Sequence, residues 1–193
     1  MLMKSILLLL LTALCYVVDA TAQQRQFKPF KVELAGGISI PSSGRVGYLL
    51  AIEPKYALTD QISIGLRSES LVIYQKPFAN LTTIGTLAIR SYSLTGDRYV
   101  ELGGRKRLSL GMAAGIYQYA LGTANYEDYK SLTRDAFGAV QFGIAPRLGL
   151  ELSHLKLGVD YNVVLRRSNQ PVRINYVSAK VGLVIGGGRY PDR

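Results

Sequence analysis

The fold class is decided by the stretch Leu155-Lys156-Leu157-Gly158-Val159-Asp160-Tyr161-Asn162-Val163. Its odd-numbered positions hold apolar or aromatic residues, and three of the four positions between them hold Lys156, Asp160 and Asn162. Because successive side chains of a strand point to opposite faces, this alternation gives one apolar face and one polar face. A helix would spread the same residues around its circumference. The stretch therefore predicts a β-strand with two unlike faces.

The same two-residue period recurs along the chain and predicts eight strands. Their expected ranges are 30–40, 46–57, 61–74, 82–93, 106–119, 135–150, 154–166 and 173–186. Each is long enough for a tilted strand to cross a bilayer, which takes ~9–11 residues. An even number of strands suits a closed barrel with both chain ends on one side. The sequence thus predicts an all-β fold, an eight-stranded antiparallel up-and-down transmembrane β-barrel.

The polar faces indicate which side of the barrel meets the membrane. They are rich in Gly, Ala and Ser, as a narrow interior requires, and they carry charges of both signs that can pair with one another. We therefore expect the apolar faces to meet lipid and the charges to line the lumen. An eight-stranded barrel is only wide enough for side chains to fill it, so these charges predict a packed, closed interior. The twelve expected lumen charges are Lys31, Glu33, Glu53, Lys55, Arg67, Glu69, Arg90, Arg147, Glu151, Lys156, Asp160 and Lys180.

Tyrosines lie near the ends of the expected strands, where membrane barrels carry interfacial aromatic girdles. The tyrosines that this places at the interfaces are Tyr48, Tyr56, Tyr74, Tyr92, Tyr119 and Tyr176.

The N-terminus has the features of a secretory signal peptide. Lys4 precedes an apolar run over 6–14, and Ala20-Thr21-Ala22 forms a small-x-small cleavage site. We expect residues 1–22 to be the signal peptide and 23–193 the outer-membrane barrel domain. Cleavage after Ala22 would remove Cys15, the only cysteine, and leave a chain without disulfides or cysteine metal sites.

The connections predict the orientation of the barrel. Short polar turns at 58–61 and 153–154 are typical of the periplasmic side, and the connections at 41–45, 75–81, 120–134 and 167–172 fall outside. The expected connection at 94–105 departs from this pattern, because it is long for a periplasmic turn.

Three segments resemble a known family. The run Ala51-Ile52-Glu53-Pro54-Lys55-Tyr56-Ala57-Leu58-Thr59-Asp60-Gln61-Ile62-Ser63-Ile64-Gly65-Leu66-Arg67 is similar to the second hairpin of small outer-membrane β-barrel proteins such as the OmpA membrane domain, OmpX and OmpW. Leu94–Tyr99 and Phe142–Glu151 resemble later segments of the same group. The resemblance covers about residues 28–190 and implies a barrel in the outer membrane, inserted by the barrel-assembly machinery. Such barrels often finish on a terminal aromatic residue, whereas this chain continues past Tyr190 to Arg193.

Residues for catalysis or cofactor binding are sparse. The single histidine, His154, falls in a predicted periplasmic turn, and a base must lie beside its nucleophile to act. Asn125, Glu127 and Asp128 could at most form a weak calcium site in an outer loop. We expect no enzyme activity, no metal and no cofactor. The formal charge of +10 is dispersed along the chain, which argues against a nucleic-acid partner.

The sequence thus favours a non-enzymatic outer-membrane barrel, expected to be a monomer, with a structural or surface-interaction role through its outer loops. Two alternatives remain open: a narrow OmpW-like conduit for small solutes, and a soluble periplasmic barrel that binds an apolar ligand. Besides outer-membrane lipid, the expected partner is lipopolysaccharide, whose phosphates basic side chains at the outer ends could bind. These candidate contacts are Arg45, Lys76, Lys130, Arg134, Arg166, Arg167 and Arg173.

Overall fold

The structure is a computed structural model, and it describes residues 27–42, 46–74, 85–103, 106–123, 140–165 and 175–187. The expected signal peptide, with Cys15, lies outside the described residues. The outer-loop residues Asn125, Glu127 and Asp128 also lie outside them, as do all seven candidate lipopolysaccharide contacts.

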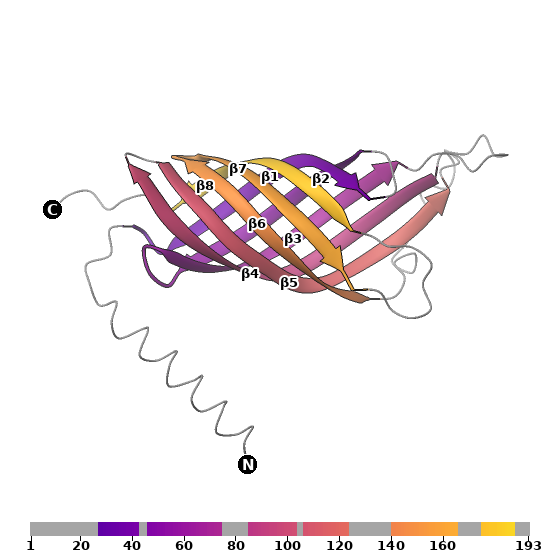
Figure 1. Cartoon of the computed structure of the whole chain (residues 1–193), viewed down its shortest axis with the longest axis horizontal. Coiled ribbons are helices and arrows are strands. Elements are labelled where there is room, and N and C mark those ends of the chain that lie inside the picture. Colours follow the sequence, from indigo (N-terminus) through magenta and orange to yellow (C-terminus); the bar gives the residue numbers. More distant parts are fainter. Residues whose placement is uncertain are drawn as a thin grey trace, which may run out of the picture.

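The described chain forms a closed barrel in which each strand pairs antiparallel with its neighbours in sequence order, and β8 closes onto β1 (Figure 1). The strands are β1 (Phe30–Pro41), β2 (Gly47–Ala57), β3 (Ile62–Tyr74), β4 (Gly85–Gly103), β5 (Lys106–Thr123), β6 (Gln141–Leu152), β7 (Leu155–Val164) and β8 (Tyr176–Gly186). This confirms the predicted fold class. Lys31 pairs with Gly186, so the first and last strands begin and end at the same rim of the barrel, called here the terminal end.

The fourth strand differs most from its predicted range. Its expected end at residue 93 was wrong, because the strand continues to Gly103 and pairs along this length with β3 and β5. Thr95-Gly96-Asp97 has the composition of a turn, yet the alternation of faces runs through it, with Thr95 and Asp97 inside and Leu94 outside. Only residues 104 and 105 separate β4 from β5. The long periplasmic connection expected at 94–105 therefore does not exist.

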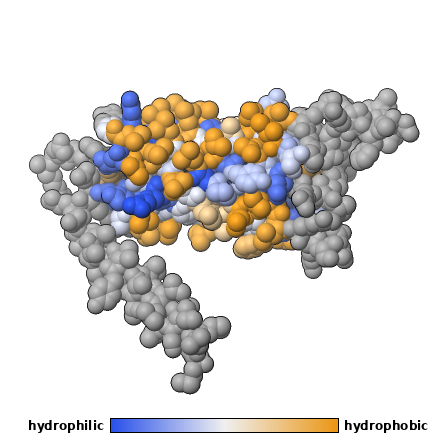
Figure 2. Space-filling view, viewed as in Figure 1, coloured by the Kyte–Doolittle hydropathy of each residue, from blue (hydrophilic) through white to orange (hydrophobic). Residues whose placement is uncertain are grey.

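The barrel has apolar side chains on its outer face and charged side chains inside, which is the reverse of a soluble protein. Leu50 on the outer face is 72% exposed, whereas Lys55 and Arg67 inside are 1% and 2% exposed. Large apolar patches cover much of the visible outer surface, crossed by a narrower hydrophilic strip (Figure 2). Such an exterior is suited to lipid, and it rules out a soluble barrel built around an apolar ligand pocket.

Among the described residues, no helix is long and apolar enough to cross a membrane.

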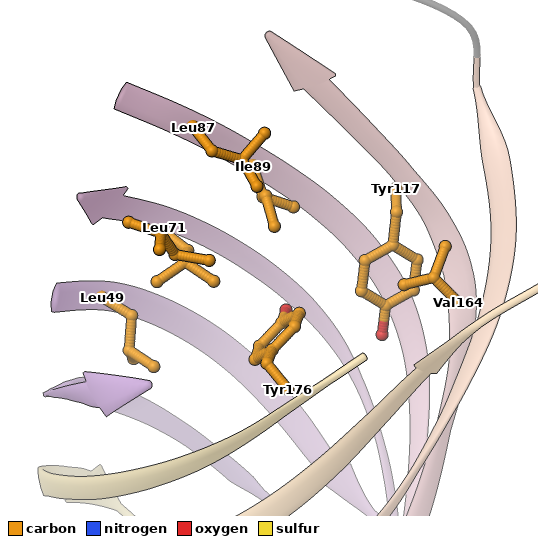
Figure 3. Close-up of a cluster of buried hydrophobic side chains, with 8 residues drawn as sticks. Leu49, Leu71, Leu87, Ile89, Tyr117, Val164 and Tyr176 are labelled. Carbon is orange, nitrogen blue, oxygen red and sulfur yellow. The ribbon is translucent and has the colours of Figure 1, made fainter. Parts of the chain in front are cut away.

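The interior is not polar along its whole length. A cluster of apolar and aromatic side chains lies inside the barrel toward the end opposite the terminal end, called here the loop end (Figure 3). Tyr119 packs against this cluster. Its buried members are Leu49, Leu71, Ile73, Leu87, Ile89, Tyr117, Val164 and Tyr176. The packed interior that the sequence predicts is therefore apolar at this end and is not lined by charges throughout. The sequence indicates this apolar cluster at Leu71-Val72-Ile73. The alternation of apolar and polar residues stops there, and both faces of the strand become apolar.

Two glycines on facing strands test the register of β4 and β5. Gly111 pairs with Asp97, and a Cβ built at Gly111 would overlap the Asp97 carboxylate; nothing lies within 4 Å of a Cβ at Gly96. Gly111→Ala should therefore lower the free energy of unfolding by about 1–3 kcal/mol through overpacking. Gly96→Ala should be neutral or raise it by about 0.5 kcal/mol, because alanine restricts the unfolded chain. Urea titrations in lipid vesicles measure both, and equal effects would mean that the register is wrong.

A charged and closed lumen

The terminal end of the lumen is closed by side chains from four segments. Lys31 Nζ lies 2.7 Å from Glu151 Oε2 and donates to the Tyr99 hydroxyl at 3.0 Å. Arg107 pairs with the other oxygen of the Glu151 carboxylate. The Phe27 ring stacks on the Arg107 guanidinium, with 4.4 Å between the guanidinium carbon and the ring centre. This mouth is therefore filled by a charge-paired and aromatic layer.

The middle of the lumen is organised around Glu33. Its carboxylate accepts hydrogen bonds from Lys55 Nζ and Lys156 Nζ, each at 2.8 Å. Lys55 also donates to Asp97 Oδ2 at 2.6 Å. These four residues come from β1, β2, β7 and β4, so the ion pairs cross the barrel rather than run along one wall.

Arg147 on β6 binds a second carboxylate of this middle layer. Its Nη1 and Nη2 donate to Glu53 Oε1 and Oε2 at 2.8 Å and 3.0 Å, the two-pronged geometry that a planar guanidinium allows. Its Nε lies 3.2 Å from Asp97 Oδ1. Thr95 donates a further hydrogen bond to Glu53 at 2.7 Å. Arg147 thus links β6 to β2 and β4 through the interior.

A third layer lies between these pairs and the apolar cluster. Asp160 pairs with both Arg67 and Lys180, and Lys180 Nζ lies 2.7 Å from Glu69 Oε2. The Tyr176 hydroxyl donates to the other oxygen of Glu69 at 3.0 Å. The aromatic end of the lumen is therefore joined to the charge network by a hydrogen bond.

The space left inside is small. One cavity of about 30 Å³ lies among Glu53, Arg67, Arg147, Asp160 and Lys180. A single water needs a cavity of about 10–15 Å³, so this one has room for about two or three waters. The Arg67 Nε and one Nη have no protein acceptor, so water there would satisfy buried donors. A space of this size accommodates only water-sized molecules.

The structure places eleven of the twelve expected lumen charges inside, each in an ion pair. Arg90 is the exception: it is exposed on the outer face of β4, because the even positions of that strand point outward. Sequence reasoning missed Asp97 and Arg107, which also pair inside. Asp97 was assigned to a loop when β4 was ended too early, although the period-two pattern through Leu94 and Thr95 could have found it.

The expected aromatic girdle needs a similar correction. Tyr48, Tyr56 and Tyr92 are exposed on the outer face, where interfacial tyrosines would lie. Tyr176 is 1% exposed and Tyr119 is partly buried against the apolar cluster, so neither belongs to the girdle. The side chain of Tyr74 lies outside the described part of the structure.

His154, the single histidine, lies at the terminal end of the described barrel. His154 is exposed in the turn between β6 and β7, and its Nδ1 lies 3.1 Å from the Val184 carbonyl oxygen. Within the described ranges, no three His, Cys, Asp or Glu residues are grouped so that they could hold a metal ion.

Glu33 offers the sharpest test of the network, because it accepts from two buried lysines. Glu33→Ala should lower the free energy of unfolding by about 3–5 kcal/mol, since it leaves Lys55 and Lys156 buried without their shared carboxylate. The matched control is Glu101→Ala, at an exposed position on β4, which should cost less than about 1 kcal/mol. Denaturant unfolding in vesicles compares the two, and a cost at Glu33 no larger than at Glu101 would contradict the network.

The fold is similar to that of solved outer-membrane barrels. Neisserial surface protein A aligns with a TM-score of 0.58 at 14% identity, over 83% of this chain and 98% of its own. OprG from Pseudomonas aeruginosa aligns over 87% of this chain and 99% of its own, at 13% identity and a TM-score of 0.47. No protein-family model and no curated protein sequence matches the chain. The likeness to Neisserial surface protein A shows the fold alone. The apolar outer face and the paired charges of the interior are observed in the structure itself. The chain is a closed eight-stranded β-barrel, and it has the fold of small outer-membrane barrels.

Proposed function

We propose that this protein is a closed, non-enzymatic outer-membrane barrel whose role is structural or is exerted through the connections at the loop end. The observation that carries the proposal is the filled lumen. Three layers of ion pairs and one apolar cluster follow each other along the interior, and the cavity among them has a volume of about 30 Å³.

A conduit for small solutes would need a continuous path of water through these layers. An entering ion would have to displace the Lys31, Arg107 and Glu151 pairs at the terminal end. It would then meet the apolar cluster at the other end, where Leu71 and Ile73 are each 1% exposed. Breaking buried pairs and dehydrating an ion against apolar side chains are both costly, which argues against conduction.

The position of His154 supports a non-enzymatic role. Its Nδ1 faces a backbone carbonyl oxygen at the terminal end, rather than a serine or carboxylate in a cleft. A general base has to lie within hydrogen-bond reach of the group that it activates. The buried carboxylates of the lumen are paired with cations, and so are held as structural groups.

The proposed contact surface is the loop end. Three of the connections there, at 75–84, 124–140 and 165–175, are longer than the two to four residues that join strands at the terminal end. Longer connections on the outer side are characteristic of outer-membrane barrels. Lys76, Lys130, Arg134, Arg166, Arg167 and Arg173 belong to these connections or lie next to them, so an anionic partner such as lipopolysaccharide remains the favoured one.

Single-channel recording in planar bilayers tests the closed lumen. The refolded protein should give no steady conductance steps, because its interior has no continuous water path. Heat-dependent gel migration of the same sample provides the control that the barrel has folded and inserted. Reproducible conductance from folded protein would overturn the proposal and favour the conduit.

A further inference from the structure

The guanidinium of Arg67 is buried in the lumen with one edge left without a partner. Arg67 is 2% exposed, and its Nη1 pairs with Asp160. Its Nε and Nη2 have no hydrogen-bond partner among the described residues. These two nitrogens share an edge of the planar group, so their N–H bonds form the fork with which arginine binds anions. A buried donor without a partner is costly, so this edge requires an acceptor from outside the chain.

The lumen cavity of about 30 Å³ provides the space for such an acceptor, because Arg67 is one of its lining residues. More cationic than anionic side chains surround this space. The cations are Arg67, Arg147, Lys156 and Lys180, and the carboxylates are Glu33, Glu53 and Asp160.

The carboxylates around the cavity already serve other cations. Arg147 binds Glu53 through both carboxylate oxygens. Asp160 Oδ2 is shared between Arg67 and Lys180. The third carboxylate accepts hydrogen bonds from two lysines. The unpartnered edge of Arg67 therefore has no carboxylate of its own within the described lumen.

The charge balance of the lumen points the same way. Seven basic and six acidic side chains form ion pairs inside the described barrel, which leaves one positive charge in excess. Glu69, on the same strand as Arg67, does not offset it locally, because its two oxygens are engaged by Lys180 and Tyr176. An excess charge in a buried site is costly unless a counter-ion accompanies it.

We propose that the cavity beside Arg67 binds one small monovalent anion, such as chloride, as a structural ion of the lumen. The fork formed by Nε and Nη2 donates to it, and Lys180, which has three donors and meets two carboxylates, adds a cation to the same space. A monatomic anion suits a cavity with room for about two or three waters. Water alone would satisfy the two donors but leave the excess charge buried. This ion goes beyond the proposed function, since it would stabilise a barrel that is already closed.

Urea unfolding in lipid vesicles tests the site when chloride is replaced stepwise by gluconate at constant ionic strength. Gluconate has the same charge but is too large for the cavity, so screening stays the same while binding is lost. Each tenfold rise in chloride above the dissociation constant should lower the unfolding equilibrium constant about tenfold.

Two variants change the site in different ways. Arg67→Gln removes the fork and its charge, and should abolish the chloride dependence. Gly158→Ala keeps every lumen charge and should reduce the dependence, because it adds a methyl group at a position that lines the cavity. A Cβ at Gly158 meets only the Leu148 carbonyl oxygen, at 3.7 Å, so the change is sterically allowed. The matched control Arg107→Gln removes a cation at the terminal end and should retain the dependence.

Heat-dependent gel migration confirms that each variant is folded, and Gly158→Ala carries the test if Arg67→Gln does not fold. The site would be overturned if the unchanged protein were equally stable in chloride and gluconate. It would also be overturned if Arg107→Gln lost the dependence as fully as Arg67→Gln, or if Gly158→Ala left it unaltered.

Crystals of protein refolded in bromide locate the ion directly. An anomalous peak within hydrogen-bond distance of Arg67 Nε and Nη2 is expected, and water there without anomalous signal would overturn the proposal. Neither measurement depends on conductance, so a failure of this site is distinct from a failure of the closed lumen.

Discussion

Pairing of charges inside a narrow barrel is the constraint on which the rest of this structure depends. Seven basic and six acidic side chains form ion pairs in the lumen of the described barrel. A buried charge is tolerated only with a partner and with its hydrogen bonds satisfied. All of these pairs except Lys31–Glu33 and Lys55–Glu53 join different strands, so they fix the strands relative to one another. A slip of one residue would turn every lumen charge of a strand toward lipid.

The same constraint explains the small residues of the inner face. Gly143 leaves room for the Tyr117 ring, and Gly65 leaves room for Lys55 and Thr95. These glycines allow long side chains from neighbouring strands to reach across the lumen. The apolar cluster completes the filling where charges end, and its Tyr176 connects the two kinds of packing through Glu69. A lumen filled in this way stabilises the barrel and closes it by the same contacts.

Much of this architecture follows from the sequence because strand alternation is local. The period of two predicted eight strands and the inward side of Lys55 and Asp160 without any tertiary information. It failed where local composition competes with alternation, as at Gly96-Asp97, which has the composition of a turn but is held in β4 by both neighbouring strands. The pairing partners themselves could not be predicted, because they depend on the shear of the closed barrel. The apolar cluster in the lumen was missed because the expected inner face was built from charged and small residues only.

Thiol accessibility along the lumen tests the closed, packed interior most directly. Ala145 points inward from β6 and is 0% exposed, whereas His154 is exposed in a terminal-end turn. With Cys15 replaced by serine, Ala145→Cys and His154→Cys each carry a single thiol for a charged, membrane-impermeant reagent to modify. The account predicts rapid modification at position 154 and none at position 145 in the folded barrel in lipid, with both reacting after unfolding. Comparable rates at the two positions in the folded state would contradict it.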